Sequence, residues 1–288
     1  MLAKTANMAI SENTKSVYNT AKNMLDKCSQ ETGFELSFPL NEEKLLNFIG
    51  WNLVKGLSAG SIKSYLSGLK KAQAALGYPA LDTDSHLIRE VLQGQENMKD
   101  RGQKSSGKRG RKFEKRLPVT LNTLKWLKAQ IRNSKLSPSE KIATWGICTL
   151  GFYGSLRLGE ILCKHEKFYD PKRVLLIKDI EICKGVEGIE KESVQFLIKS
   201  GKTNKSGKPE TIVVYATGDG TCPVRAVKKM LDLNRRLASD LPFFSVNGSQ
   251  PVTQNKFNEI LKMLTHDTFK RGKISGHSFR SGIPSMLA

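Results

Sequence analysis

One segment divides this sequence more sharply than any other: RGQKSSGKRGRKFEKR, residues 101–116. It holds eight Lys or Arg residues, one Glu, three Gly and no aliphatic residue. A segment without aliphatic side chains has little to contribute to a packed core, so this composition predicts a linker between two folded units. We therefore expect one unit over residues 1–100 and a second over residues 117–288.

The charge of the chain points to its partner. The formal net charge is +20, and such an excess indicates a polyanion, of which nucleic acid is the commonest. The alternative is a basic protein whose charge serves only solubility. In the linker, the cations form either a solvated tether or a flexible strap that contacts the phosphates of a DNA duplex. The strap interpretation assigns DNA binding to Lys108, Arg109, Arg111 and Lys112.

The cysteines and the apolar runs bear on the compartment. Five cysteines, an odd number with no C-x-x-C pair, indicate neither a disulfide framework nor a zinc site. No apolar run approaches the length of a membrane span, and the first 25 residues lack the unbroken apolar core of a secretory signal. We expect a cytosolic or nuclear protein, and GKRGRK in the linker is a weak match to a nuclear localisation signal.

The first hundred residues have the apolar spacing of amphipathic helices separated by polar joints. A small helical bundle follows from this pattern. One helix presents Ser61, Lys63, Ser64 and Lys70, which either form a solvated polar face or face a DNA groove. The expected helices cover residues 11–33, 41–56, 58–77 and 83–100.

The second unit mixes helical and alternating patterns. Residues 173–183 and 192–215 are rich in β-branched residues, and the second run predicts a hairpin that turns around 204–208. The fold class is therefore mainly α with a small antiparallel sheet. The segment over residues 137–162 predicts a pair of helices, with interruptions at Gly151 and Gly154. Helices are expected over residues 117–134, 137–162, 222–237 and 253–269, with a short extended piece over 243–248.

Three features of the second unit suggest chemistry. Arg157 lies inside an apolar helical pattern, where it either pairs with Glu160 for structure alone or, oriented by Glu160, binds phosphate with its two-pronged guanidinium. His277 and Arg280 are three residues apart and share a face if the segment is helical, which favours an anion site over a packed histidine. The lysines in IKSGKTNKSGK either solvate a turn or supply a general acid.

Other site types lack their signatures. The sequence contains neither G-x-x-x-x-G-K-[ST] nor G-x-G-x-x-G, and the second unit has no acidic cluster with metal-binding spacing. Nucleotide cofactors and two-metal phosphoryl chemistry are therefore poorly supported, and we expect neither metal nor cofactor.

The order of these features resembles the tyrosine recombinase (phage integrase) family. An arginine in GSLRLGEI precedes a hairpin lysine, which precedes His-x-x-Arg in GHSFRSG. The resemblance extends over nearly the whole chain, as a helical core-binding (SAM-like) unit, a basic linker and a mixed catalytic unit. Recombinases of DIRS- and Crypton-type mobile elements are especially similar in LPVTLNTLKWL, SGKTNKSGK, CPVRAV and GHSFRSG.

The resemblance implies a role for each matching residue. Arg157 and Arg280 would clamp the scissile phosphate, where losing one fixed donor typically costs about 10²–10³-fold in rate. His277 would donate a hydrogen bond or carry a proton, and Lys202, with Lys199 as the alternative, would protonate the leaving 5′-oxygen. No metal or cofactor is implied. The partner would be double-stranded DNA, on which self-association is possible in this family.

The family's nucleophile is a tyrosine that lies after His-x-x-Arg and forms a 3′-phosphotyrosine. Only SGIPSMLA follows Arg280 here, and it contains no Tyr, Trp or His. We therefore expect a recombinase truncated before its nucleophile, which binds duplex DNA and does not cut it. The alternatives are a non-catalytic DNA-binding protein derived from such a recombinase, and an unrelated basic RNA-binding or scaffold protein.

Overall fold

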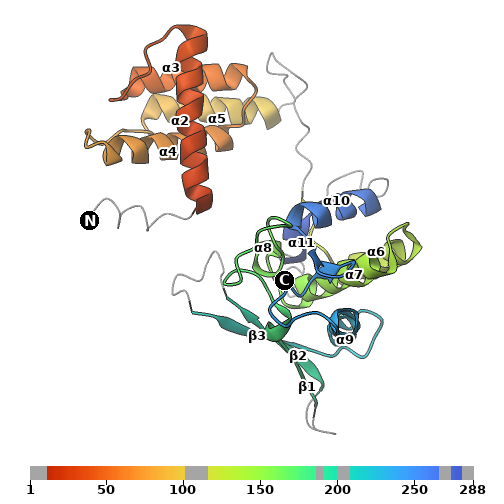
Figure 1. Ribbon diagram of the computed structural model, residues 1–288. Helices are drawn as coiled ribbons and strands as arrows, with labels where there is room; N and C mark the ends of the chain where they lie inside the picture. The colour runs from red at the N-terminus through yellow and green to blue at the C-terminus, as the bar shows by residue number, and fades with distance from the viewer. Residues whose placement is uncertain (1–11, 101–115, 186–190, 200–207, 266–273, 281–288) are drawn as a thin grey trace. The chain divides into compact units, whose positions relative to one another are not determined.

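The computed structural model describes residues 12–100, 116–185, 191–199, 208–265 and 274–280. The chain divides into two compact units, Met1–Lys112 (unit 1) and Phe113–Ala288 (unit 2). Unit 1 is helical, and unit 2 combines helices with a small antiparallel sheet (Figure 1). This confirms the predicted fold class. The four linker cations assigned to DNA, Lys108, Arg109, Arg111 and Lys112, lie outside the described residues.

The described residues of unit 1 form four helices around one apolar core. Asn41 and Ser58 cap two of them, each accepting a hydrogen bond from a backbone N–H three residues on. The first and third helices cross closely at Gly68, where an added Cβ would lie 2.8 Å from the ring of Tyr18. The buried Gln73 ties the bundle to its loops, because its amide bonds both backbone groups of Leu40. The helices are α2 (Glu12–Thr32), α3 (Glu42–Val54), α4 (Ala59–Ala75) and α5 (His86–Asp100).

Unit 2 is organised around one buried helix, α7 (Pro138–Tyr153), whose residues 146–152 are all buried. α6 (Leu121–Asn133), α9 (Pro223–Asn234) and α11 (Gly276–Arg280) pack against it. Thr120 caps α6 as its sequence indicates, by accepting from the N–H of Thr123. α8 (Leu158–Ile161) and α10 (Gln254–Thr265) complete the helices that the structure describes here.

The sheet of unit 2 has the strand order β1-β2-β3, with both pairs antiparallel. Its strands are β1 (Ile180–Cys183), β2 (Ser193–Ile198) and β3 (Glu210–Tyr215). β2 and β3 pack on α9, so alternate residues such as Val194, Phe196 and Val214 are buried. The predicted β2–β3 hairpin is present, and its expected turn lies mostly outside the described residues. A second pair, β4 (Ser245–Val246) with β5 (Gln250–Pro251), precedes α10.

The predictions for Gly151 and for residues 173–183 were wrong. Gly151 does not interrupt a helix, because it lies within α7 with the side chain of Phe279 against it, 3.4 Å from an added Cβ. The real break begins at Gly154, the C-cap of α7, and continues through Ser155, whose φ is 49°. Residues 173–183 are not one strand: a 3₁₀ turn, η1 (Ile177–Asp179), precedes the four residues of β1.

Three general features follow from the described residues. None of their helices is long and apolar enough to cross a membrane. They contain no group of three His, Cys, Asp or Glu side chains placed to hold a metal ion. All five cysteines have free thiols, and burial raises the pKa of the Cys163 thiol to about 11.

Candidate functional site

Arg157 occupies the N-cap of α8, with extended backbone angles, and not the interior of a helix as predicted. Glu160 holds it at two points. One carboxylate oxygen accepts the backbone N–H of Arg157 at 2.8 Å, and the other accepts Nη1 of its guanidinium at 2.9 Å. The Arg157 side chain is 23% exposed and that of Glu160 is 10% exposed. The predicted ion pair is therefore present, and it fixes one side of a partly accessible guanidinium.

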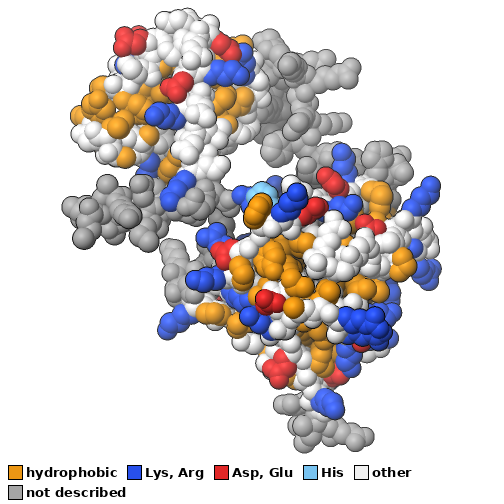
Figure 2. Space-filling view, viewed as in Figure 1, with side chains coloured by type: hydrophobic (Ala, Val, Ile, Leu, Met, Phe, Trp, Pro, Cys, Tyr) orange, Lys and Arg blue, Asp and Glu red, His pale blue; other side chains and the backbone are white. Residues whose placement is uncertain are grey.

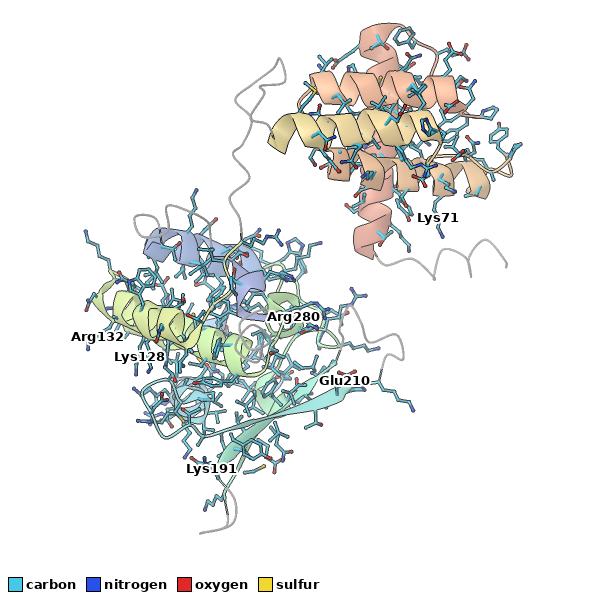
Figure 3. The ribbon with its side chains drawn as sticks, turned by 180° about the vertical axis from the view of Figure 1, so that it is seen from behind. Lys71, Lys128, Arg132, Lys191, Glu210 and Arg280 are labelled. Atoms are coloured by element: carbon cyan, nitrogen blue, oxygen red, sulfur yellow. The ribbon has the colours of Figure 1, made fainter. Side chains whose placement is uncertain are left out.

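The His-x-x-Arg segment forms the short helix α11, as its sequence indicates. Ser278 accepts the N–H of Ser275 at 3.0 Å with its hydroxyl oxygen, and its own carbonyl accepts the N–H of Val119 at 3.0 Å. Phe279 is fully buried, whereas His277 is exposed and Arg280 is half-buried. Burial of Phe279 thus anchors α11 in the core of unit 2, whereas His277 and Arg280 retain exposed surface; Figure 3 labels Arg280.

The starts of α8 and α11 are in direct contact. A Cβ added to Gly276 would lie 1.9 Å from Cδ1 of Leu158 and 2.3 Å from its Cγ. Leu158 directly follows Arg157, and Gly276 directly precedes His277. The structure therefore brings together two of the predicted site segments that are far apart in the sequence. Glycine is required at position 276 because its missing side chain is what permits this approach.

The structure describes only one of the two candidate hairpin lysines. Lys202, the predicted general acid, lies outside the described residues. Lys199, the alternative, follows β2, and its ammonium lies 2.5 Å from Oδ2 of Asp179 and donates to the carbonyl of Pro171 at 3.0 Å. Its side chain is 15% exposed and that of Asp179 is 5% exposed. These contacts give Lys199 a clear anchoring role at the base of the hairpin.

The predicted groove-facing residues lie on α4, and all four are exposed. Two of them are engaged within the helix end: Ser61 shares a 2.8 Å hydrogen bond with the capping Ser58, and Ser64 donates to the carbonyl of Gly60. The ammonium of Lys63 lies 3.3 Å from Glu96 of α5. Lys70 adds an exposed cation to the same helix.

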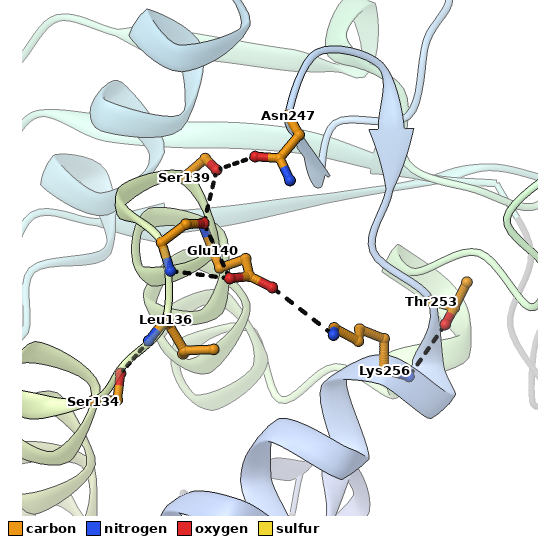
Figure 4. Close-up of polar contacts among 8 residues, drawn as sticks. Ser134, Leu136, Ser139, Glu140, Asn247, Thr253 and Lys256 are labelled. Atoms are coloured by element: carbon orange, nitrogen blue, oxygen red, sulfur yellow. Dashed lines mark hydrogen bonds and ion pairs between the residues drawn. The ribbon is translucent and has the colours of Figure 1, made fainter.

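A polar recess, which the sequence analysis did not identify, lies between the start of α7, the β4–β5 pair and the start of α10. It encloses about 240 Å³. Glu140 accepts the N–H of Ser137 at 3.0 Å and lies 3.9 Å from the ammonium of Lys256 (Figure 4). The hydrogen bond from that backbone N–H lowers the pKa of Glu140 below its ordinary value. Asn247, which also lines the recess, accepts a hydrogen bond from the hydroxyl of Ser139.

A second missed network fixes the end of α7. The hydroxyls of Tyr153 and Thr221 are 2.7 Å apart, and the Thr221 hydroxyl donates to Asp219 at 2.8 Å. The hydroxyl of Thr217 also donates to Asp219 and is the main reason that the pKa of this carboxyl is lowered. The turn TGDGT before α9 is the sequence signal that predicts such side-chain capping, although not its partner on α7.

Comparison with known proteins identifies the fold. No family model matches the sequence, and no curated protein matches it. Among solved structures, the pre-cleavage complex of the XerH site-specific recombinase bound to difH substrate has a TM-score of 0.51 at 19% identity. It covers 86% of this chain, and the chain spans 59% of that protein. The post-cleavage XerH complex with palindromic difH has a TM-score of 0.55 at 16% identity and covers 96% and 68% of the two chains.

The Tn1549 transposon integrase, in complex with transposon right-end DNA, gives a TM-score of 0.56 at 15% identity. This match covers 96% of the present chain and 81% of the integrase chain. The protein therefore has the fold of the tyrosine recombinases and integrases, in agreement with the resemblance found in its sequence.

Proposed function

We propose that this chain is a DNA-binding protein of the tyrosine recombinase type and that unit 2 grips a phosphodiester with Arg157 and Arg280. The observation that carries the proposal is the contact between Leu158 and Gly276, which joins the segments that carry these two arginines. The charge of +20 supplies the general attraction to a polyanion. The XerH and Tn1549 structures with the same fold are complexes with DNA.

The proposed grip uses chemistry that arginine supplies well. A guanidinium is always charged and donates two parallel hydrogen bonds to phosphate oxygens. Glu160 holds Arg157 in one orientation, so less side-chain freedom is lost when a phosphate binds. His277 would add a donor from the exposed side of α11. In the family that the sequence resembles, a hairpin lysine protonates the leaving oxygen, and we assign this role to Lys202 ahead of Lys199.

We further propose that the polypeptide of these 288 residues binds duplex DNA without cutting it. All six of its tyrosines precede Arg280, whereas the family's nucleophile follows the His-x-x-Arg segment. The further proposal of a mobile-element origin is supported by the sequence resemblance to DIRS- and Crypton-type recombinases. Self-association on DNA belongs to the same proposal and is tested by cross-linking the bound complex.

The test is a binding titration of fluorescent duplex DNA at two salt concentrations, beside a nicked suicide duplex analysed on denaturing gels for a covalent adduct. We expect salt-sensitive binding and no adduct. Arg157→Ala and Arg280→Ala should each weaken binding and reduce the slope of log affinity against log salt by about 1. The matched control is Arg132→Ala on α6, which Figure 3 shows away from Arg280.

Three other results would contradict parts of this proposal, the third of them measured by adding duplex RNA to the titration. If Arg132→Ala and Arg280→Ala weakened DNA binding equally, nonspecific attraction to the charge of the chain would explain the binding. The proposed contact of Arg280 with a phosphodiester would then be refuted. A covalent adduct would refute the second proposal, and mapping it would show which tyrosine reacts. Equal affinity for duplex RNA would favour the alternative of a basic RNA-binding protein.

A further inference from the structure

The loop that follows α8 is anchored on both sides, and one of its aromatic side chains is exposed to solvent. At its start, the carbonyl of Cys163 accepts the N–H of Gln254 at 3.0 Å. Val174 and Leu176 are buried with Cys163 in a small core of their own, and Tyr169 packs against it. Phe168, between these anchors, is 81% exposed, the highest value among the large hydrophobic side chains of the described residues.

The exposed ring borders a groove. The groove encloses about 490 Å³ between residues 164–168 and the first turns of α10. Lys164, Lys167 and Lys256 line it, together with Glu166 and Glu259, and the ammonium of Lys256 also lies 3.9 Å from Glu140. The lining therefore carries a net positive charge, on a chain that is itself strongly cationic. Lys and Arg side chains are also spread over the face of unit 2 that Figure 2 shows.

The same loop lies beside two segments of the candidate site. It leaves α8 at Leu162, five residues after Arg157. Farther along, its Pro171 accepts a hydrogen bond from Lys199 at the base of the β2–β3 hairpin. The loop therefore connects the helix that Arg157 caps to the residues that anchor the base of the hairpin.

We propose that Phe168 stacks on an unpaired base of a DNA strand whose backbone lies along the lysines of this groove. The inference rests on the proposed function, since it names the part of the DNA that this loop binds. Cationic side chains beside an exposed aromatic ring suit single-stranded nucleic acid: the cations follow the phosphates, and the ring offers its face to any base. A paired base inside a duplex is stacked on both faces and offers none to this ring, so the loop distinguishes an unpaired internal base from a paired one.

The test uses two duplexes that differ at one position. One contains 2-aminopurine paired with thymine, and the other contains it as an extra, unpaired base whose fluorescence falls when it stacks. We expect the unmodified 288-residue chain to bind the unpaired form about fivefold or more tightly, with quenching. Phe168→Ala should remove the preference and the quenching and leave affinity for the paired duplex unchanged. Phe168→Trp should retain both, and Phe34→Ala, which removes an exposed phenylalanine from unit 1, should change neither.

The outcomes separate this inference from the proposed function. If the chain binds neither duplex at low salt, the proposed function fails and the inference fails with it. Binding of both duplexes with no effect of Phe168→Ala would overturn the inference alone. Full retention of preference and quenching in Phe168→Leu would also overturn it, because leucine offers an apolar contact without a flat ring.

Discussion

Gly276 lies against Leu158 so closely that no other residue fits at position 276 without movement, since an added Cβ would meet Cδ1 at 1.9 Å. We therefore expect Gly276→Ala to destabilise unit 2 by about 1–3 kcal/mol, the usual cost of overpacking a core. The loss is measured as a lower urea midpoint at an unchanged slope. Gly276→Ala should weaken DNA binding as well, because the start of α11 would move relative to Arg157.

The control for this substitution is Gly94→Ala in α5, where an added Cβ meets nothing within 4 Å. Alanine is favoured over glycine inside a helix, so this variant should be as stable as the parent or gain up to about 1 kcal/mol. Shortening Leu158 in the Gly276→Ala background should recover part of the loss. Equal midpoints for the two glycine variants would contradict the close packing.

Removing the carboxylate of Glu160 should damage both stability and binding. Glu160 accepts a backbone N–H and a guanidinium N–H, and its side chain is 10% exposed. Glu160→Ala should cost about 2 kcal/mol in the free energy of unfolding, because a partly buried charge loses its partner. Glu160→Gln keeps an acceptor for the N–H and should cost less. Glu181→Gln, on the exposed edge of β1, serves as the control and should be neutral.

The local features of the fold were predictable from the sequence because their causes are local. Asn41 and Thr120 cap the helices that follow them, since a short polar side chain satisfies a free N–H three residues on. The alternating, β-branched pattern of residues 192–215 likewise indicated the strands β2 and β3. Gly151 was misinterpreted because it lies inside the buried helix α7 and packs against Phe279, which comes to it from far along the chain.

Part of the local structure of the candidate site was predictable from the sequence, and its three-dimensional geometry was not. The pairing of Arg157 with Glu160 spans three residues and follows from the sequence, although the place of Arg157 at a helix start does not. Lys199 was proposed as an alternative acid, and its contact with Asp179 depends on the fold of η1 against the hairpin. Such contacts arise from tertiary packing, which sequence periodicity does not encode.

Glu140 should make part of the stability of unit 2 dependent on pH. The Ser137 N–H lowers its pKa below the ordinary value of 4.5, so the folded state binds this proton more weakly than the unfolded state. The stabilisation is therefore present above pH 4.5 and is lost as the pH falls through the lowered pKa. Glu140→Gln should reduce the difference between urea midpoints measured at pH 7 and at pH 3. An unchanged difference would show that other groups cause the acid sensitivity.

The hydroxyl pair of Tyr153 and Thr221 should couple the end of α7 to the turn before α9. Their oxygens are 2.7 Å apart, and Tyr153 directly precedes the break that leads to Arg157. Tyr153→Phe should lower the free energy of unfolding by about 1 kcal/mol, the net value of one such hydrogen bond. Adding Thr221→Ala to Tyr153→Phe should cost less than Thr221→Ala alone, because the shared bond is lost only once. Tyr215→Phe on β3, where the tyrosine is 57% exposed, is the matched control. Strict additivity of the two losses in the double variant would show that the hydroxyls do not interact in solution.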